Sequence, residues 1–194
     1  MNKIVVMLSN RHVHLTPASL AVLFGSGYEL RLQRDLGGGE FAAEETIDIA
    51  TAHGRINHLR VLGPLRNYTQ VELLKSDCYK LQIDPPVVMS GNLENAVPLT
   101  LIGPKGEMTL NCGIIAQRHV HLTPDTAANL DVKPGDEISL LAAGERSLVF
   151  NNVGIKLYPG PVDLAHLDLD EGNAANLSNG DFLFIVKNIN EQHL

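Results

Sequence analysis

The heptapeptide RHVHLTP occurs at residues 11–17 and again at residues 118–124. The second copy starts 107 positions after the first in a chain of 194 residues. Seven consecutive identities at this spacing indicate an internal duplication. The repeat therefore predicts two related domains packed about a pseudo-twofold axis.

The duplication extends beyond the heptapeptide. In each copy the Thr-Pro pair is typical of a helix N-cap followed by proline at the first helical position. Another short helix is expected late in each half, and aligning these late helices places Glu72 opposite His166. Each of these residues precedes an acidic residue at the helix start, Asp77 or Glu171, by five positions. The four helices are expected over residues 18–25, 76–83, 125–132 and 170–177.

Short β-rich runs, separated by turns such as Lys133-Pro134-Gly135-Asp136, make up most of the remaining sequence. Many short strands at this spacing are typical of compact β-barrels or a sandwich. The strands are expected over residues 3–8, 46–49, 56–62, 70–73, 100–102, 137–141, 148–150, 154–157 and 182–186.

The composition bounds the function. A net charge of −7 argues against general nucleic-acid binding, which depends on excess Lys and Arg to neutralise phosphates. The apolar start IVVML (residues 4–8) is far shorter than a membrane span or a signal-peptide core. The two cysteines, Cys78 and Cys112, form no disulfide framework and no CxxC motif. We therefore expect a cytoplasmic protein that binds neither nucleic acid nor membrane.

Each His-x-His pair is a candidate metal site. In a strand, residues i and i+2 point to the same face, so both imidazoles of a pair can bind one ion. The repeat alignment supplies a third ligand in each half, and both resulting sets leave open positions on zinc, as a catalytic metal requires. A chance pair of histidines on a surface strand would be the simpler explanation for one copy, but not for two. The predicted ligands are His12, His14 and Glu72 in one set, and His119, His121 and His166 in the other.

Three arginines accompany these sets. Arg11 and Arg118 precede the two His-x-His pairs, and a structural ion pair is as good an explanation for them as anion binding. Arg66 lies six residues before Glu72. Its guanidinium could clamp a phosphate or a carboxylate at the edge of the same site, although an ordinary surface arginine has equal weight. For the two cysteines, inert packing is a better explanation than a nucleophilic role.

Five segments together resemble the PduL-type phosphotransacylases (phosphate propanoyltransferases), and the match spans essentially the whole chain. They are SNRHVHLT (9–16), GGGEFAAEETIDI (37–49), VLGPLRNYTQVE (61–72), AQRHVHLTP (116–124) and LAHLDLDEGNAANL (164–177). The resemblance implies a mainly β fold, in which two pseudo-symmetric β-barrels capped by short α-helices enclose a dizinc site at their interface. It also implies exchange of CoA and phosphate on an acyl group, namely acyl phosphate + CoA ⇌ acyl-CoA + phosphate.

The resemblance also assigns residues. It implies two Zn²⁺ per chain held by the two ligand sets above, with another divalent metal left open, and Arg66 as the catalytic residue that contacts phosphate. Because the first strand is exchanged in this family, residues 1–10 and 117–194 are expected to form one barrel and residues 11–116 the other. The implied CoA contacts are Ser9, Arg34, Arg60, Leu62, His166 and Asn173.

The sequence departs from the family pattern at a few points. Glu40 stands where a Gln is usual, which would alter phosphate affinity if its side chain lines the pocket. Gly172 replaces the usual Ala, a small loss of helix propensity. The amphipathic N-terminal extension of microcompartment members is not visible, so targeting by that route is not expected.

The expected function is direct acyl transfer, acetyl or propionyl, between CoA and phosphate without an acyl-enzyme. Two alternatives remain open. One is a zinc-dependent acyl-CoA thioesterase or another dinuclear metallohydrolase, and the other is a non-catalytic, metal-stabilised ligand-binding module. A homodimeric assembly is also left open.

Overall fold

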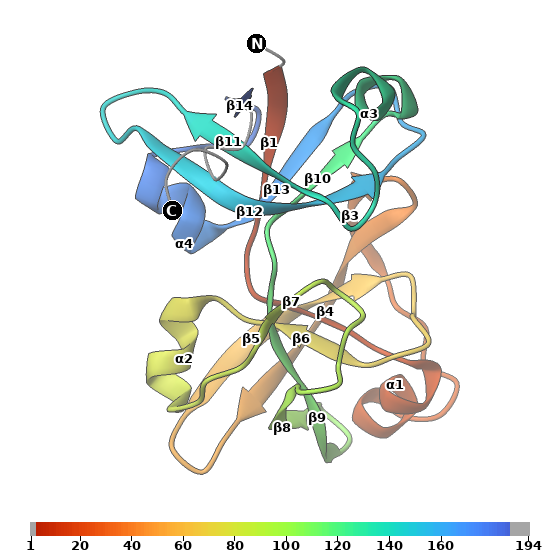
Figure 1. Cartoon of the computed structure of the whole chain (residues 1–194). Coiled ribbons are helices and arrows are strands. Elements are labelled where there is room, and N and C mark those ends of the chain that lie inside the picture. The colour runs from red at the N-terminus through yellow and green to blue at the C-terminus, as the bar shows by residue number, and fades with distance from the viewer. Residues whose placement is uncertain (1–2, 187–194) are drawn as a thin grey trace. The chain divides into compact units, whose positions relative to one another are not determined.

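The computed structural model of the chain describes residues 3–186 (Figure 1). The described backbone divides into two compact units, residues 3–9 with 117–186 and residues 10–116. Six strands close into a barrel in each unit, and within residues 3–186 four short helices accompany them. The predicted mainly β fold of two barrels is confirmed.

The barrel of the unit that contains the second His-x-His combines the first strand of the chain with five strands from its C-terminal part. Two of its strand pairs, β1–β13 and β10–β12, are parallel, and the other pairs are antiparallel. In order around the barrel the strands are β1 (Lys3–Ser9), β13 (Leu164–Asp168), β10 (His119–Leu122), β12 (Leu148–Leu157), β11 (Glu137–Ala142) and β14 (Phe182–Val186).

The barrel of residues 10–116 repeats this arrangement, including its two parallel pairs, here β6–β9 and β2–β5. Its ring consists of β9 (Glu107–Ala116), β6 (Gln70–Glu72), β2 (His12–His14), β5 (Arg55–Gly63), β4 (Glu40–Ala50) and β8 (Val97–Ile102). Two further strands extend the sheet, β3 (Leu32–Gly37) beside β4 and β7 (Val87–Val88) beside β9.

The exchange of first strands is reciprocal. β1 precedes β2 in the sequence but pairs with β13 and β14, whereas β9 precedes β10 but pairs with β6 and β8. Figure 1 shows β1 in red next to the blue β13. Each half of the duplicated sequence thus contributes its first strand to the barrel of the other half, so neither barrel closes from one half alone.

Strand β9 was not expected, because Asn111 and Gly113 within it are usually turn residues. The tertiary packing explains the glycine. A Cβ added at Gly113 would lie 2.8 Å from Leu99 Cδ1 and 2.9 Å from Val97 Cγ2 of the neighbouring strand. Glycine at this position therefore allows β8 to pack closely.

Side-chain alternation in the repeated strands separates the core from the candidate ligands. Val13 is fully buried and pairs in register with Val61 and Val71, which belong to the same hydrophobic core. Val120 pairs in the same way with Ile155 and Ala165 in the other barrel. Since successive side chains of a strand point to opposite faces, the histidines on either side of each valine lie on the outer face of their barrel.

The helices begin where the Thr-Pro pairs predict. Thr16 accepts a hydrogen bond from the Ser19 N–H (3.0 Å), and Thr123 accepts one from the Thr126 N–H (3.2 Å). The late helices differ at their N-caps, since the cap residue of α4 is Asp168, whereas that of α2 is Leu74. The four helices are α1 (Pro17–Phe24), α2 (Lys75–Leu81), α3 (Pro124–Leu130) and α4 (Leu169–Ala175).

The repeated arginines join β2 and β10 to the late helices. Arg11 Nε donates to Asp77 Oδ2 at 2.8 Å, and Arg118 Nη1 donates to Glu171 Oε1 at 2.9 Å. Both acids also accept a hydrogen bond from the backbone N–H three residues earlier, at the start of their helix. Of the two explanations offered by the sequence, this geometry favours the structural ion pair.

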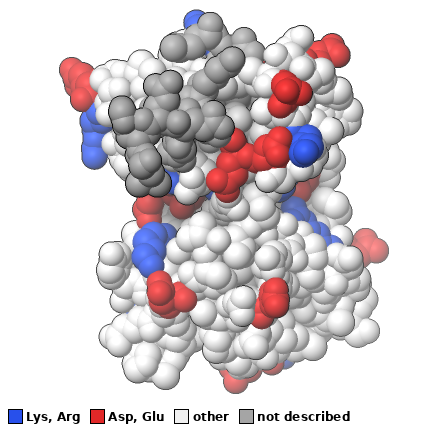
Figure 2. All heavy atoms as spheres, viewed as in Figure 1, with Lys and Arg blue, Asp and Glu red and all other residues white. Residues whose placement is uncertain are grey.

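One face of the molecule shows its charges in separate groups (Figure 2). On the face in Figure 2, acidic and basic side chains stand singly or in small groups among uncharged atoms. Of the helices within residues 3–186, the longest has eight residues, and none has the length and apolar character needed to cross a membrane.

Candidate active site

His12, His14 and Glu72 converge on the outer face of the barrel formed by residues 10–116. The Nε2 atoms of the two histidines are 3.2 Å apart. Glu72 Oε2 lies 3.4 Å from His12 Nε2, and Glu72 Oε1 lies 3.9 Å from His14 Nε2. Strand register produces this convergence, since His12 pairs directly with Glu72 across β2 and β6. Within residues 3–186, these three residues form the group of His, Cys, Asp or Glu side chains whose ligand atoms all lie within 4.8 Å of one another.

The carboxylate of Glu72 is held by its neighbours. Gln70 Nε2 donates to Glu72 Oε1 at 2.7 Å, and Ser90 Oγ donates to the same oxygen at 2.9 Å. Gln70 is in turn fixed by the Gly91 N–H, which donates to Gln70 Oε1 at 2.8 Å. Because both hydrogen bonds to the carboxylate go to Oε1, Oε2 is the oxygen left for a metal ion.

Arg66 lies at the edge of the same network. Its Nη1 donates to Tyr68 Oη at 2.7 Å and to Ser90 Oγ at 3.5 Å. Ser90 thereby contacts both the guanidinium and the carboxylate of Glu72. The Nη2 atom of Arg66 donates to Glu40 Oε1 at 2.5 Å. The structure thus brings Arg66 and the first ligand set into one hydrogen-bonded group.

The three histidines of the second set also come together. Ring centroids are 5.1 Å apart for His119 and His121, 5.0 Å for His119 and His166, and 4.4 Å for His121 and His166. His119 pairs in register with His166 across β10 and β13, as His12 does with Glu72. The Nε2 atom of His166 is buried and has no hydrogen-bond partner in the structure. A buried nitrogen of this kind is the type of atom that a metal ion would satisfy.

Lys156 adds a positive charge to the second set. It pairs in register with His121, and its Nζ donates to His119 Nε2 at 3.4 Å. The equivalent position beside His14 in the other barrel is Leu62. The second set therefore has a cation at the position where the first has an apolar side chain.

Both sets hold one histidine in the tautomer that metal binding needs. His12 Nδ1 lies 2.8 Å from Asn10 O, and His119 Nδ1 lies 3.0 Å from Gln117 O. A carbonyl only accepts, so Nδ1 carries the proton and Nε2 carries the lone pair that a metal ion would take. In His12 this nitrogen faces His14 and Glu72, whereas in His119 it accepts from Lys156.

Burial favours the neutral form of His14, His119 and His166. It lowers the pKa of His14 to about 2, with further lowering by the charges of His12 and Arg66. It lowers the pKa of His119 to about 3, where the ammonium of Lys156 adds to the effect, and that of His166 to about 4. Neutral imidazoles and a carboxylate are the donors that zinc prefers, so the donor chemistry of both sets suits a divalent metal ion. Within residues 3–186, the ligand atoms of the first set also lie close enough together to share one ion.

The residues expected to contact CoA are found in both units. Arg60 pairs in register with His12, and its Nη1 donates to the backbone oxygens of Ala43 (2.9 Å) and Glu44 (2.7 Å). Leu62, on β5 like Arg60, pairs in register with His14 of β2, and Arg34 is exposed on β3. In the other unit, the half-buried Ser9 donates to Leu167 O at 3.4 Å, and Asn173 is exposed on α4. Their role in CoA binding stays a prediction, as does the location of the active site at the barrel interface.

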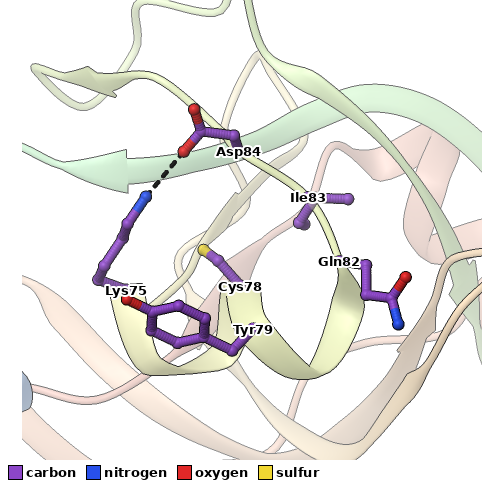
Figure 3. Close-up of a pocket in the computed structure, with 6 residues that line it drawn as sticks. All are labelled: Lys75, Cys78, Tyr79, Gln82, Ile83 and Asp84. Atoms are coloured by element: carbon purple, nitrogen blue, oxygen red, sulfur yellow. Dashed lines mark hydrogen bonds and ion pairs between the residues drawn. The ribbon is translucent and has the colours of Figure 1, made fainter.

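Neither cysteine is activated. Cys78 lies in the wall of a hollow beside α2, between the Lys75–Asp84 ion pair and Tyr79 (Figure 3). Its Sγ donates to Leu74 O at 3.3 Å, and burial raises its pKa. Burial raises the pKa of Cys112 to about 12. A thiol is nucleophilic as the thiolate, so these surroundings favour inert packing.

Sequence reasoning missed four residues of the site. Gln70 lies on the same strand face as Glu72, a signal that side-chain alternation could have given. Lys156 could have been found by extending the repeat alignment, which sets it against Leu62. Tyr68 and Ser90 carry no such signal, since only the tertiary structure brings Ser90 to Glu72.

Comparison with known proteins shows which family the chain belongs to. The family model for phosphate propanoyltransferase matches residues 5–178. A phosphate propanoyltransferase of Rhodopseudomonas palustris is 43% identical over 187 residues, which cover 95% of this chain and 83% of the relative. The corresponding protein of Thermotoga maritima is 42% identical over 187 residues, covering 95% and 89%. That of Salmonella typhimurium is 39% identical over 174 residues, covering 89% and 83%. This chain therefore belongs to the phosphate propanoyltransferase family.

Proposed function

We propose that this chain transfers an acyl group, propionyl or acetyl, directly between CoA and phosphate at its two metal-binding histidine sets. Family membership supports the phosphate acyltransferase activity itself. The observation that carries the finer proposal is the contact of Ser90 with both Arg66 and Glu72, because it links an anion-binding guanidinium to a metal-ligand carboxylate.

The residues of the first set have complementary tasks in this proposal. Arg66 binds the phosphate oxygens through its guanidinium and orients them, since its planar donors match an oxyanion. Gln70 and Ser90 hold Glu72 in place for the metal. A divalent metal bound at the two sets would supply Lewis-acid chemistry and stabilise the CoA thiolate at neutral pH.

The reaction requires no acyl-enzyme. In the direction of acyl phosphate formation, a phosphate oxygen attacks the thioester carbonyl, the new C–O bond forms, and the C–S bond breaks to release CoA thiolate. The raised pKa values of Cys78 and Cys112 support direct transfer, because neither thiol is available as a nucleophile near neutral pH. Cys78→Ala and Cys112→Ala are therefore expected to retain activity.

The test combines metal analysis with a free-thiol assay on acetyl-CoA and propionyl-CoA, with and without phosphate. The expected result is two equivalents of zinc per chain and CoA release that depends on phosphate. The two acyl groups differ by one methylene, which limits discrimination to about 1–3 kcal/mol. Release of CoA and free acid without phosphate would instead identify a thioesterase, and an inactive, metal-loaded chain would indicate a binding module.

A further inference from the structure

The guanidinium of Arg66 already holds an anion in this structure. Its Nη2 atom donates to Glu40 Oε1 at 2.5 Å, and the two side chains are 23% and 49% exposed. The other terminal nitrogen, Nη1, donates to Tyr68 Oη and Ser90 Oγ. A carboxylate oxygen on Nη2 therefore occupies a donor that a bidentate oxyanion would use.

The backbone places Glu40 beside Arg66. Strands β3 and β4 are joined by the two-residue turn Gly38-Gly39, whose φ values of 61° and 84° favour glycine, and Glu40 follows as the first residue of β4. The next residue, Phe41, pairs in register with Gly63, three residues before Arg66. A Cβ on Gly63 would overlap the ring of Phe41, so this close approach requires glycine. The hairpin geometry thus directs Glu40 to the segment that carries Arg66.

We infer that Glu40 is an internal competitor for the phosphate position on Arg66. The inference rests on the proposed function, because it takes Arg66 as the group that binds the phosphate oxyanion. A phosphate that binds Arg66 through both terminal nitrogens competes with the Glu40 carboxylate for the Nη2 donors. The bound phosphate also lies close to the negative charge of Glu40, and repulsion between these two anions weakens phosphate binding.

The competition affects the two directions of the reaction differently. When phosphate is a substrate, displacement of Glu40 raises the concentration needed to fill the site. When phosphate is the leaving product, the carboxylate returns to Nη2 and replaces it, which favours release. Glu40 therefore weakens product inhibition by phosphate during acyl-CoA formation.

The test is a titration of the metal-loaded chain with inorganic phosphate, followed by calorimetry. Glu40→Gln removes the charge but keeps an oxygen for Arg66, and it is expected to bind phosphate about tenfold more tightly. Glu44→Gln is the matched control. Glu44 also lies on β4, its side chain is 47% exposed, and it pairs with an arginine, Arg31, at 3.1 Å. This control changes the same charge and is expected to leave phosphate affinity unchanged.

Kinetics provide a second readout. For Glu40→Gln, the KM for phosphate and the concentration for half inhibition by product phosphate should both fall about tenfold, while the KM for acyl-CoA stays constant. In an Arg66→Lys background, the gain from Glu40→Gln should largely disappear, since the two side chains act on each other.

Two results would overturn the inference. Unchanged or weaker phosphate binding by a folded Glu40→Gln chain would mean that Glu40 only positions Arg66. An equal gain in phosphate affinity for Glu44→Gln would show that the effect comes from net charge alone. If Glu40→Gln lowers the melting temperature, Glu40→Ala provides a second variant for the same titration. Absence of phosphate-dependent CoA release in the unsubstituted chain would instead refute the proposed function, which separates the two failures.

Discussion

The two histidine sets occupy equivalent three-strand frames, β5-β2-β6 in residues 10–116 and β12-β10-β13 in the other unit. In the first, the residue opposite the leading histidine is the carboxylate Glu72, and in the second it is the imidazole His166. The nearby cation also differs. It is Arg66 from the loop before β6 in the first set, and Lys156 from β12 itself in the second.

The two halves share the polar contacts that connect their strands and helices. The arginine of each RHVHLTP copy pairs with an acid of a late helix, and each threonine caps the first helix of its half. The backbone N–H of Thr16 donates to Thr69 Oγ1 (3.2 Å), and that of Thr123 donates to Asp163 Oδ1 (2.7 Å). The repeated polar residues thus maintain the fold, while the positions around the histidines have diverged. Under the proposed function, the two ligand sets have different tasks in one reaction.

The largest expected effect comes from removing one ligand of either set. His12→Ala and His119→Ala should each lose about one metal equivalent and lower kcat by about 10³-fold, because Lewis-acid stabilisation of the transition state contributes several kcal/mol. Metal analysis and the phosphate-dependent thiol assay provide the measurements. His53→Ala, an exposed histidine, is the control. Full activity in either ligand variant would show that only one half is catalytic. The difference between the two ligand sets would then have no role in the reaction.

Lowering the pH should destabilise the two units of the metal-free chain to different extents. The folded-state pKa values of His119 and His166, about 3 and about 4, and that of His14, about 2, lie below the usual 6.5. The unfolded chain therefore binds more protons below pH 6.5, so their contribution to stability is present above that pH and is lost as pH falls toward the folded values. Each histidine contributes about 1.4 kcal/mol per pH unit in this window.

Two of these histidines lie in the unit that contains β10 and one in the other unit, so the former should lose more protection between about pH 6.5 and about pH 5. Hydrogen exchange measures protection in each unit, and nitrogen NMR of the imidazoles checks their protonation directly. Burial raises the pKa of Glu171 in the same unit, which acts in the opposite sense and reduces the difference. Charged imidazoles at about pH 5 in the folded chain would contradict the prediction.

The shared scaffold can be tested by breaking its ion pairs. Arg11→Ala and Arg118→Ala should each lower the free energy of unfolding by about 1–3 kcal/mol, because each leaves a largely buried carboxylate without its cation. The side chains of Asp77 and Glu171 are 6% and 22% exposed, so the larger loss is expected for Arg11→Ala. Chemical denaturation measures the loss, and Arg146→Ala, at an exposed arginine, should stay within about 0.5 kcal/mol of the unsubstituted chain. Stable variants that no longer bind phosphate would favour anion binding instead.

The sequence predicted the shared features better than the divergent ones. The duplication, the capped helices and the positions of Glu72 and His166 beside the His-x-His pairs follow from local patterns and one alignment. Strand register places Glu72 opposite His12 and His166 opposite His119. Strand β9 was missed because Gly113 resembles a turn residue, whereas packing against β8 explains it. The Ser90 contact to Glu72 joins residues 18 positions apart that share no motif, so no local pattern announces it.

The smallest expected effect concerns Lys156, which stands where the other half has Leu62. Its ammonium lies 3.4 Å from His119 Nε2 and opposes a metal cation there. In a His12→Ala background, which leaves the three-histidine set intact, Lys156→Leu should bind zinc about tenfold more tightly in competition with a chromogenic chelator. Lys133→Leu, in the same unit, controls for net charge. The reciprocal Leu62→Lys, in a His119→Ala background, should weaken zinc binding at the first set. If Lys156→Leu leaves zinc affinity unchanged but raises the KM for acyl phosphate, Lys156 binds the substrate anion, and each half then contributes its own cation to the phosphate.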